Sequence, residues 1–100
     1  MRLIVLFEDD PAAGVDVRRR LMPEHLAFLE RNAVKIQAAG PLTNPDGQGA
    51  GGLWLVDAEG PSVVDALVRE DPFWPTGLRR SVRILTWNQV FANGKRLVAV

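Results

Sequence analysis

Met22-Pro23-Glu24-His25-Leu26-Ala27-Phe28-Leu29-Glu30 contains the only histidine of this 100-residue chain. Pro23 is typical of the first turn of a helix, where the backbone N–H has no helical partner to lose. Apolar residues at helical spacing predict one buried stripe, made of Met22, Leu26, Leu29 and Ala33. At about 100° per residue, His25 lies roughly 60° from the centre of this stripe and Phe28 roughly 120° from it. We therefore expect a helix that ends near Asn32, with His25 at the border of its buried face and Phe28 against a pocket wall or partner surface.

A histidine at such a border can reach a cleft. Imidazole titrates near neutral pH, which suits general acid and base chemistry. A single histidine can equally do no more than satisfy a local hydrogen bond. The residue type alone leaves both interpretations open.

The composition is that of an ordinary globular domain. Apolar residues make up 47% and charged residues 24% of the chain, and this length predicts one domain over residues 1–100. Lys+Arg and Asp+Glu are both 12, and this neutrality argues against nucleic acid as a partner, because nucleic-acid binding relies on a basic surface. With no cysteine and one histidine, we expect no thiol chemistry and no metal site. The chain also shows no sign of a bound cofactor.

The apolar run at residues 3–7 predicts a strand. It is too short for a signal peptide or a membrane span, and Glu8, Asp9 and Asp10 follow it. We expect a cytoplasmic protein with no membrane partner. Both sides of this strand are apolar, with Leu3 facing one side and Ile4 the other.

The remaining segments predict an α+β fold of the ferredoxin-like type, in the order β-α-β-β-α-β. The later strands are expected at residues 34–38, 53–56, 81–87 and 97–100, and the second helix begins at Pro61. Gly40-Pro41 is expected to stop the second strand, and the glycine-rich residues 42–52 are expected to form a mobile lid. Both helices of this fold cover one face of the sheet. The apolar character of the other face predicts that two copies pack sheet to sheet.

A carboxylate stands where the second helix must end. The residue before a proline is driven out of the α region, so Asp71 leaves the helix before Pro72. Its carboxylate is free either to meet His25 or to bond the backbone of a turn. Phe73 and Trp74 follow, as pocket wall or as core. Three arginines precede the histidine, at positions 18, 19 and 20; they form a solvated face, or one of them, for which we take Arg20, reaches over the cleft to an anionic substrate.

The order of short motifs resembles the YciI-like (YCII-related) family. The motifs are His25-Leu26-Ala27-Phe28-Leu29, Gly40-Pro41-Leu42, Gly52 before a strand, Asp71-Pro72-Phe73, Gly77-Leu78 and Val90-Phe91. The resemblance implies a dimeric α/β-barrel of ferredoxin-like subunits and an active site built on a histidine–aspartate pair, here His25 and Asp71. The family includes a dehydrochlorinase that acts on a chlorinated hydroxyhydroquinone.

These observations give three functional hypotheses. In the first, His25 and Asp71 perform acid/base chemistry without a cofactor, as an elimination or isomerisation of a small aromatic or phenolic substrate, and the substrate contacts Phe28, Gly40, Pro41, Phe73, Trp74 and Arg20. In the second, the dimer is a non-catalytic module that binds a small ligand or a partner protein. In the third, His25 is an axial haem ligand in a barrel of related architecture.

Overall fold

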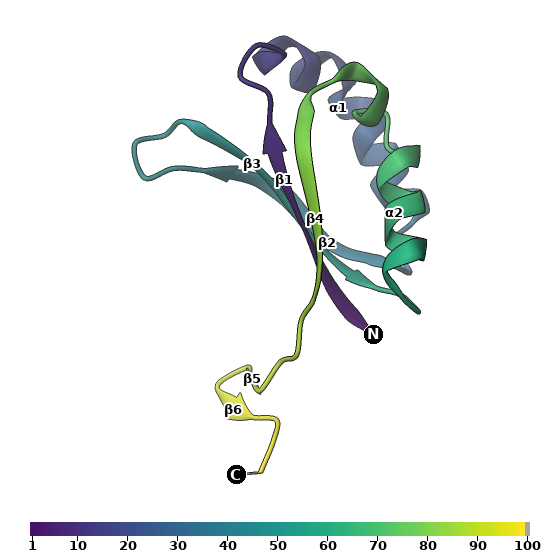
Figure 1. The fold of residues 1–100 in the computed structure, drawn as a ribbon, viewed down its shortest axis with the longest axis vertical. Coiled ribbons are helices and arrows are strands. Elements are labelled where there is room, and N and C mark those ends of the chain that lie inside the picture. The colour runs from purple at the N-terminus through teal and green to yellow at the C-terminus, as the bar shows by residue number, and fades with distance from the viewer. Residues whose placement is uncertain (100) are drawn as a thin grey trace.

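Four antiparallel strands form the main sheet, in the order β2-β3-β1-β4 (Figure 1). The computed structural model describes residues 1–99, and of Gly14 and Val15 only the backbone. The elements are β1 (Arg2–Asp9), α1 (Gly14–Arg31), β2 (Ile36–Thr43), β3 (Gly49–Asp57), α2 (Pro61–Glu70), the 3-10 turn η1 (Trp74–Thr76), β4 (Arg79–Thr86), β5 (Phe91–Ala92) and β6 (Lys95–Arg96). This is the predicted α+β fold of the ferredoxin-like type.

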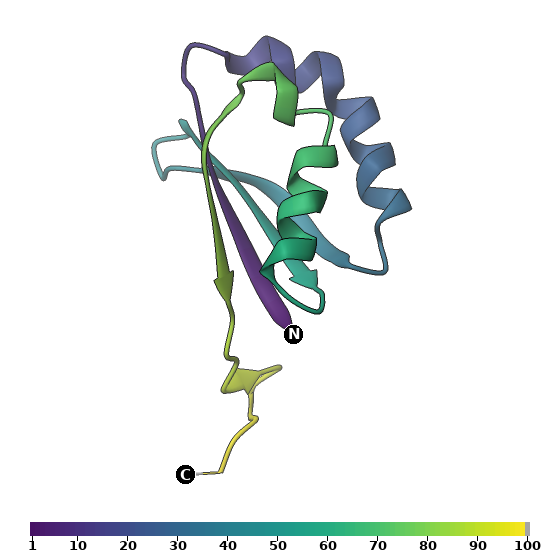
Figure 2. The ribbon, with the colours of Figure 1, turned by 45° about the vertical axis from the view of Figure 1, so that its right-hand side comes forward.

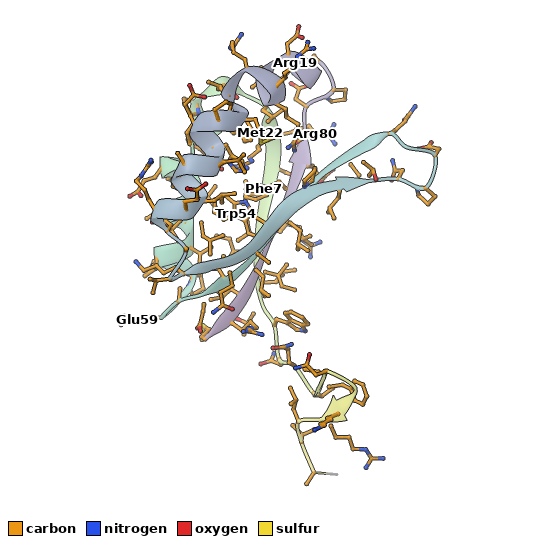
Figure 3. The ribbon with its side chains drawn as sticks, turned by 180° about the vertical axis from the view of Figure 1, so that it is seen from behind. Phe7, Arg19, Met22, Trp54, Glu59 and Arg80 are labelled. Atoms are coloured by element: carbon orange, nitrogen blue, oxygen red, sulfur yellow. The ribbon has the colours of Figure 1, made fainter. Side chains whose placement is uncertain are left out.

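Both helices cover one face of the sheet, and the core lies between them (Figures 1 and 2). On β1, alternate residues point to that face, so Leu3, Val5 and Phe7 are almost fully buried. Trp54 of β3 packs edge-on against Phe7, with their ring centroids 5.1 Å apart, and Figure 3 shows both rings between α1 and the sheet. Val64 and Val68 close the core from α2.

Helix α1 begins at Gly14, so Pro23 lies inside it and not in its first turn. The prediction failed because proline in a helix removes only one hydrogen bond, the one to the carbonyl four residues earlier. Pro23 and Arg19 are exposed, and a carbonyl that faces solvent can bond to water. A first-turn position and a solvated mid-helix position therefore look alike in the sequence.

The buried face of α1 is rotated relative to the predicted stripe. His25 is 8% and Phe28 1% exposed, while Leu26 is 48% exposed. Phe28 is thus a core residue, and its ring lies 5.9 Å from that of Trp54. A phenyl ring buries more apolar area than a leucine side chain, so packing against Trp54 favours this rotation.

The second and third strands form one long hairpin. β2 runs through Gly40-Pro41 to Thr43, and residues 44–48 alone form the turn. Pro41 is tolerated because β2 lies at the edge of the sheet, where a missing N–H breaks no ladder. Most of the expected lid at residues 42–52 is therefore strand. One of the glycines in this segment, Gly51, is required by packing. A Cβ at this position would lie 1.8 Å from the carbonyl oxygen of Phe7.

The C-terminal segment extends away from the body of the molecule (Figure 2). β5 and β6 pair across Asn93-Gly94, and both of these turn residues have positive φ. The predicted strand at residues 97–100 is not present over residues 97–99, and Val100 lies outside the described residues. Side chains that follow β4 are exposed, including Val90, Phe91, Leu97 and Val98.

The sheet face opposite the helices carries apolar side chains. Ile4 and Leu6 of β1 pair across the sheet with Leu55 and Leu53 of β3, and no described helix lies over them (Figure 1). Along the described residues, no helix is both long and apolar enough to cross a bilayer.

Candidate active site

His25 and Asp71 meet although 46 residues separate them in the chain. The Nδ1 atom of His25 lies 2.9 Å from Oδ1 of Asp71, and both side chains are at least nine-tenths buried. α1 supplies the imidazole from its sheet-facing side. The carboxylate comes from the residue that follows α2, because Pro72 makes Asp71 adopt an extended backbone with ψ 132°. The imidazole also stacks on Phe73, with a centroid distance of 4.4 Å.

Asp71 accepts hydrogen bonds at both oxygens. Oδ1 accepts from the backbone N–H of Phe73 at 3.0 Å as well as from His25. Oδ2 accepts from Nη1 of Arg79 at 2.8 Å. The two alternatives that the sequence left open for this carboxylate, a turn and a histidine partner, thus occur together.

Asp71 is ionised at neutral pH. Burial raises the pKa of this carboxyl, but the hydrogen bond from His25, the charge of Arg79 and the N–H of Phe73 together hold the pKa below its ordinary value. A carboxylate can only accept hydrogen bonds, so Nδ1 of the neutral His25 ring carries the proton. The lone pair of a neutral imidazole is then on Nε2, the atom left free for chemistry.

Arg79 is a site residue that sequence reasoning missed. Its side chain is 3% exposed, and its guanidinium carbon lies 3.8 Å from the ring centroid of Phe7. It also lies 5.4 Å from the ring centroids of Trp54 and Phe73. Arg79 and Arg80 are the first residues of β4. Two consecutive arginines at the start of a strand are typical of a solvated surface, so the sequence offered no reason to place Arg79 in the site. The available signal was that Asp71, if buried, requires a buried cation nearby.

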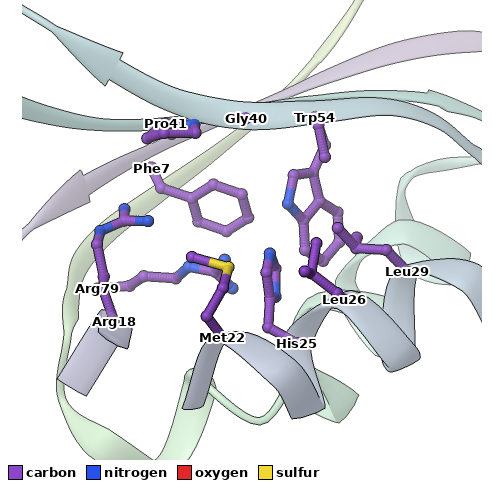
Figure 4. Close-up of a pocket in the computed structure, with 12 residues that line it drawn as sticks. Phe7, Arg18, Met22, His25, Leu26, Leu29, Gly40, Pro41, Trp54 and Arg79 are labelled. Atoms are coloured by element: carbon purple, nitrogen blue, oxygen red, sulfur yellow. The ribbon is translucent and has the colours of Figure 1, made fainter. Parts of the chain in front are cut away.

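A cavity of about 90 Å³ adjoins the imidazole. Figure 4 shows His25 projecting from α1 into this space, with Phe7, Trp54 and Arg79 around it. The lining also includes Arg18, Met22, Leu26, Leu29, Ala39, Gly40, Pro41 and Gly52. The lining contains two guanidinium groups and no carboxylate. Each guanidinium is paired with a carboxylate, so this cavity favours a small, partly apolar ligand with hydrogen-bond acceptors.

The structure brings only some of the predicted site residues to the cavity. Gly40 and Pro41 line it. Phe73 lies behind the imidazole and Phe28 in the core beneath Trp54.

Two predicted site residues lie elsewhere. Trp74 is covered by the guanidinium of Arg69 at 5.2 Å, and Arg20 is exposed. Of the three consecutive arginines, Arg18 is the one that lines the cavity.

Arg18 is held at the cavity by fixed partners. Its Nε and Nη2 atoms donate to Oδ2 of Asp9 at 3.0 and 2.7 Å, and Nη2 also donates to the carbonyl of Gly51 at 3.3 Å. One helical turn is about 3.6 residues, so Arg18 and Arg20 point to different sides of α1. Within residues 1–99, no three His, Cys, Asp or Glu side chains gather as a metal site would require.

The fold and site define a ferredoxin-like α+β protein with a buried imidazole–carboxylate pair beside a small cavity. Residues 1–88 match the YCII-related domain, and the chain belongs to that family. No match is found among curated proteins.

Two solved structures are similar to this chain. One is 5-chloro-2-hydroxyhydroquinone dehydrochlorinase (TftG) from Burkholderia phenoliruptrix, in complex with 2,5-dihydroxybenzoquinone; it is 29% identical with a TM-score of 0.75, over 88% of this chain and 94% of that chain. The other is Rv0793 from Mycobacterium tuberculosis, 15% identical with a TM-score of 0.50 over the same shares, a likeness of fold alone.

Proposed function

We propose that this protein is a small-molecule enzyme in which His25 and Asp71 perform general acid/base chemistry on a small aromatic or phenolic substrate. The observation that carries the proposal is the 2.9 Å contact between Nδ1 and Oδ1 at the wall of a cavity. The likeness to a dehydrochlorinase supports elimination over isomerisation.

In this mechanism Nε2 of His25 accepts a proton from a substrate hydroxyl. Asp71 fixes the ring through Nδ1–H and stabilises the imidazolium that forms. In a dehydrochlorination, that proton first passes to the ring carbon that bears chlorine, which gives a keto tautomer. Loss of a second hydroxyl proton then expels chloride with the electron pair of the C–Cl bond, so overall the substrate loses one proton and one chloride and becomes a quinone. The electrons balance without an oxidant or a cofactor. A base placed in this way contributes about two to four orders of magnitude in rate.

The cavity lining supports a planar substrate with an acidic hydroxyl. Phe7 and Trp54 offer aromatic surface, and Arg18 offers a fixed cation for a phenolate oxygen. The cavity of about 90 Å³ is smaller than the roughly 150 Å³ in which benzene binds. Met22 at the lining is flexible enough to move aside for a ring. A porphyrin is far larger than this cavity, which disfavours the haem hypothesis.

The test is turnover of chlorinated hydroxyhydroquinones, measured as released chloride. His25→Ala is expected to lower the rate about 10²- to 10⁴-fold, and Glu24→Ala, an exposed neighbour on α1, is expected to leave it unchanged. Equal turnover by His25→Ala and the unaltered protein would contradict the mechanism. Saturable binding of 2,5-dihydroxybenzoquinone without turnover of any compound would favour the second candidate, a non-catalytic ligand-binding module.

We also propose that two copies associate through the open sheet face. Leu53 and Leu55 remain half-buried there, and Leu85 is 38% exposed. Apolar area of this kind is rarely left to water in a monomer. The pairing gives the dimeric α/β-barrel that the family resemblance implies.

A further inference from the structure

Asp71 has a second partner that the acid/base mechanism does not use. Oδ1 faces His25, whereas Oδ2 lies 2.8 Å from Nη1 of Arg79. The side chains of Asp71 and Arg79 are 0% and 3% exposed, so water reaches neither charge to any extent. The carboxylate is therefore held between one cation and one imidazole.

Stability alone is a weak reason for burying this ion pair. The cost of removing two charges from water often equals or exceeds their attraction. Arg79 is also incompletely satisfied, because its buried Nε atom has no hydrogen-bond partner among the residues that the structure describes. Its main compensation is Asp71 together with the faces of Phe7, Trp54 and Phe73. A functional role for the positive charge of Arg79 explains its buried position better than stability does.

We propose that Arg79 is a positioning residue of this site: it binds Oδ2, keeps Oδ1 turned toward His25, and balances the charge of Asp71. An unbalanced carboxylate next to the ring would favour the protonated imidazolium, which cannot accept a proton from a substrate. The site is then a chain of three residues, His25, Asp71 and Arg79.

Few charged groups face His25. The effect of Arg79 on the titration of the imidazole can therefore be measured separately from that of the other charges. Asp71 comes from the end of α2 and Arg79 from β4. Arg18 comes from α1 itself and is paired with Asp9 of β1. β2 and β3 face the ring with Gly40, Pro41, Gly52 and Trp54, none of which titrates.

The titration of the imidazole tests this proposal without any substrate. His25 is the only histidine, so its ring protons give a single, unambiguous set of NMR signals. In Arg79→Gln the titration midpoint is expected to rise by about one pH unit, the usual size of a nearby-charge effect. Arg80→Gln is the matched control, because Arg80 is the next residue on the same strand and pairs with Glu8 at the surface. It is expected to leave the midpoint unchanged.

A double variant shows whether Arg79 acts through Asp71. In an Asp71→Asn background, Arg79→Gln should move the midpoint less, because only the direct repulsion between the guanidinium and the imidazolium is then lost. An unchanged midpoint in Arg79→Gln alone overturns the proposal, and so does an equal shift in both backgrounds. If Arg79→Gln does not fold, Arg79→Lys decides: it keeps the charge and should keep the midpoint within a few tenths of a unit, and a full-unit shift in it overturns the proposal.

Kinetics give a second readout, which rests on the proposed function. Once a substrate is known, Arg79→Gln should lower kcat/KM about tenfold near pH 6, because more of the imidazole is then protonated. The loss should disappear toward pH 9, and KM should change little. A rise in KM at every pH would show that Arg79 contacts the substrate directly and would overturn a positioning role. Failure to find any substrate would defeat the proposed function and leave the NMR result standing.

Discussion

Asp71 shows how much one residue can depend on its surroundings. A carboxylate buried alone would take up a proton, because the charged form is costly away from water. Here a ring N–H, a backbone N–H and a guanidinium share the two oxygens. The local turn from Asp71 to Phe73 accounts for one of these three partners. The other two come from α1 and β4.

This arrangement predicts that stability depends on pH in the acid range. The pKa of Asp71 is raised by burial but lowered overall by His25, Arg79 and Phe73, so it lies below the value of about 3.9 in an unfolded chain. A group of this kind stabilises the fold above about pH 4, and its contribution is lost as the pH falls through the folded-state pKa. Asp71→Asn should lower the free energy of unfolding by about 3–5 kcal/mol at pH 7 and flatten its fall in acid.

Urea titrations between about pH 2 and pH 7 measure both effects, since unfolding free energies can be read at each pH. Asp65→Asn is the control, because Asp65 forms an exposed pair with Arg69 on α2. It should keep the acid slope of the unaltered protein. A slope in Asp71→Asn as steep as in the unaltered protein would show that Asp71 does not carry the dependence.

At the scale of elements, α1 is long enough to reach both ends of the cavity. Its 18 residues carry Arg18 and His25 nearly two turns apart on related faces. Proline is unfavourable inside a helix, and Pro23 lies between these two residues. The helix therefore persists because tertiary packing, chiefly of Phe28 on Trp54, outweighs local preference.

Replacing this proline should stabilise the protein. Pro23→Ala restores one backbone N–H and removes a ring from an exposed position, for an expected gain of about 1–3 kcal/mol, reduced somewhat by the greater freedom of the unfolded chain. Thermal unfolding should show an increase of several degrees in Tm. Pro61→Ala is the control, since Pro61 is at the start of α2, where no hydrogen bond is missing. A gain of equal size in both variants would mean that the interior position is not what costs stability.

At the scale of the whole molecule, one sheet face is covered by helices and the other is not (Figure 1). Light scattering at micromolar concentration should give twice the mass of one chain if the open faces pair. Leu55→Lys places a charge in that face and should give a monomer, because a buried unpaired charge is strongly unfavourable.

Val34→Lys serves as the comparison, since Val34 is 89% exposed and lies in the turn between α1 and β2. This variant should keep the mass of the unaltered protein. A clean monomer in the unaltered protein would exclude the paired-sheet arrangement.

The sequence by itself determined the order of the elements from β1 to β4 and the end of α2, and it named His25 and Asp71 as a candidate pair. The first two of these features are local: Pro72 disfavours helical backbone at Asp71, and alternation of apolar residues is typical of a strand. Tertiary structure decided the start of α1, the face that it buries and the passage of β2 through Pro41. In each of these cases the local preference of the sequence was weak. Contacts with the sheet, or a position at its edge, contributed more free energy than that local preference.

Arg79 belongs to the same group. A sequence lists charges without saying which of them lose contact with water, and only the packing of Phe7, Trp54 and Phe73 around this guanidinium makes it part of the site. Arg18 replaces Arg20 at the cavity for a related reason, because the direction of a side chain on a helix depends on how the helix is rotated against the sheet.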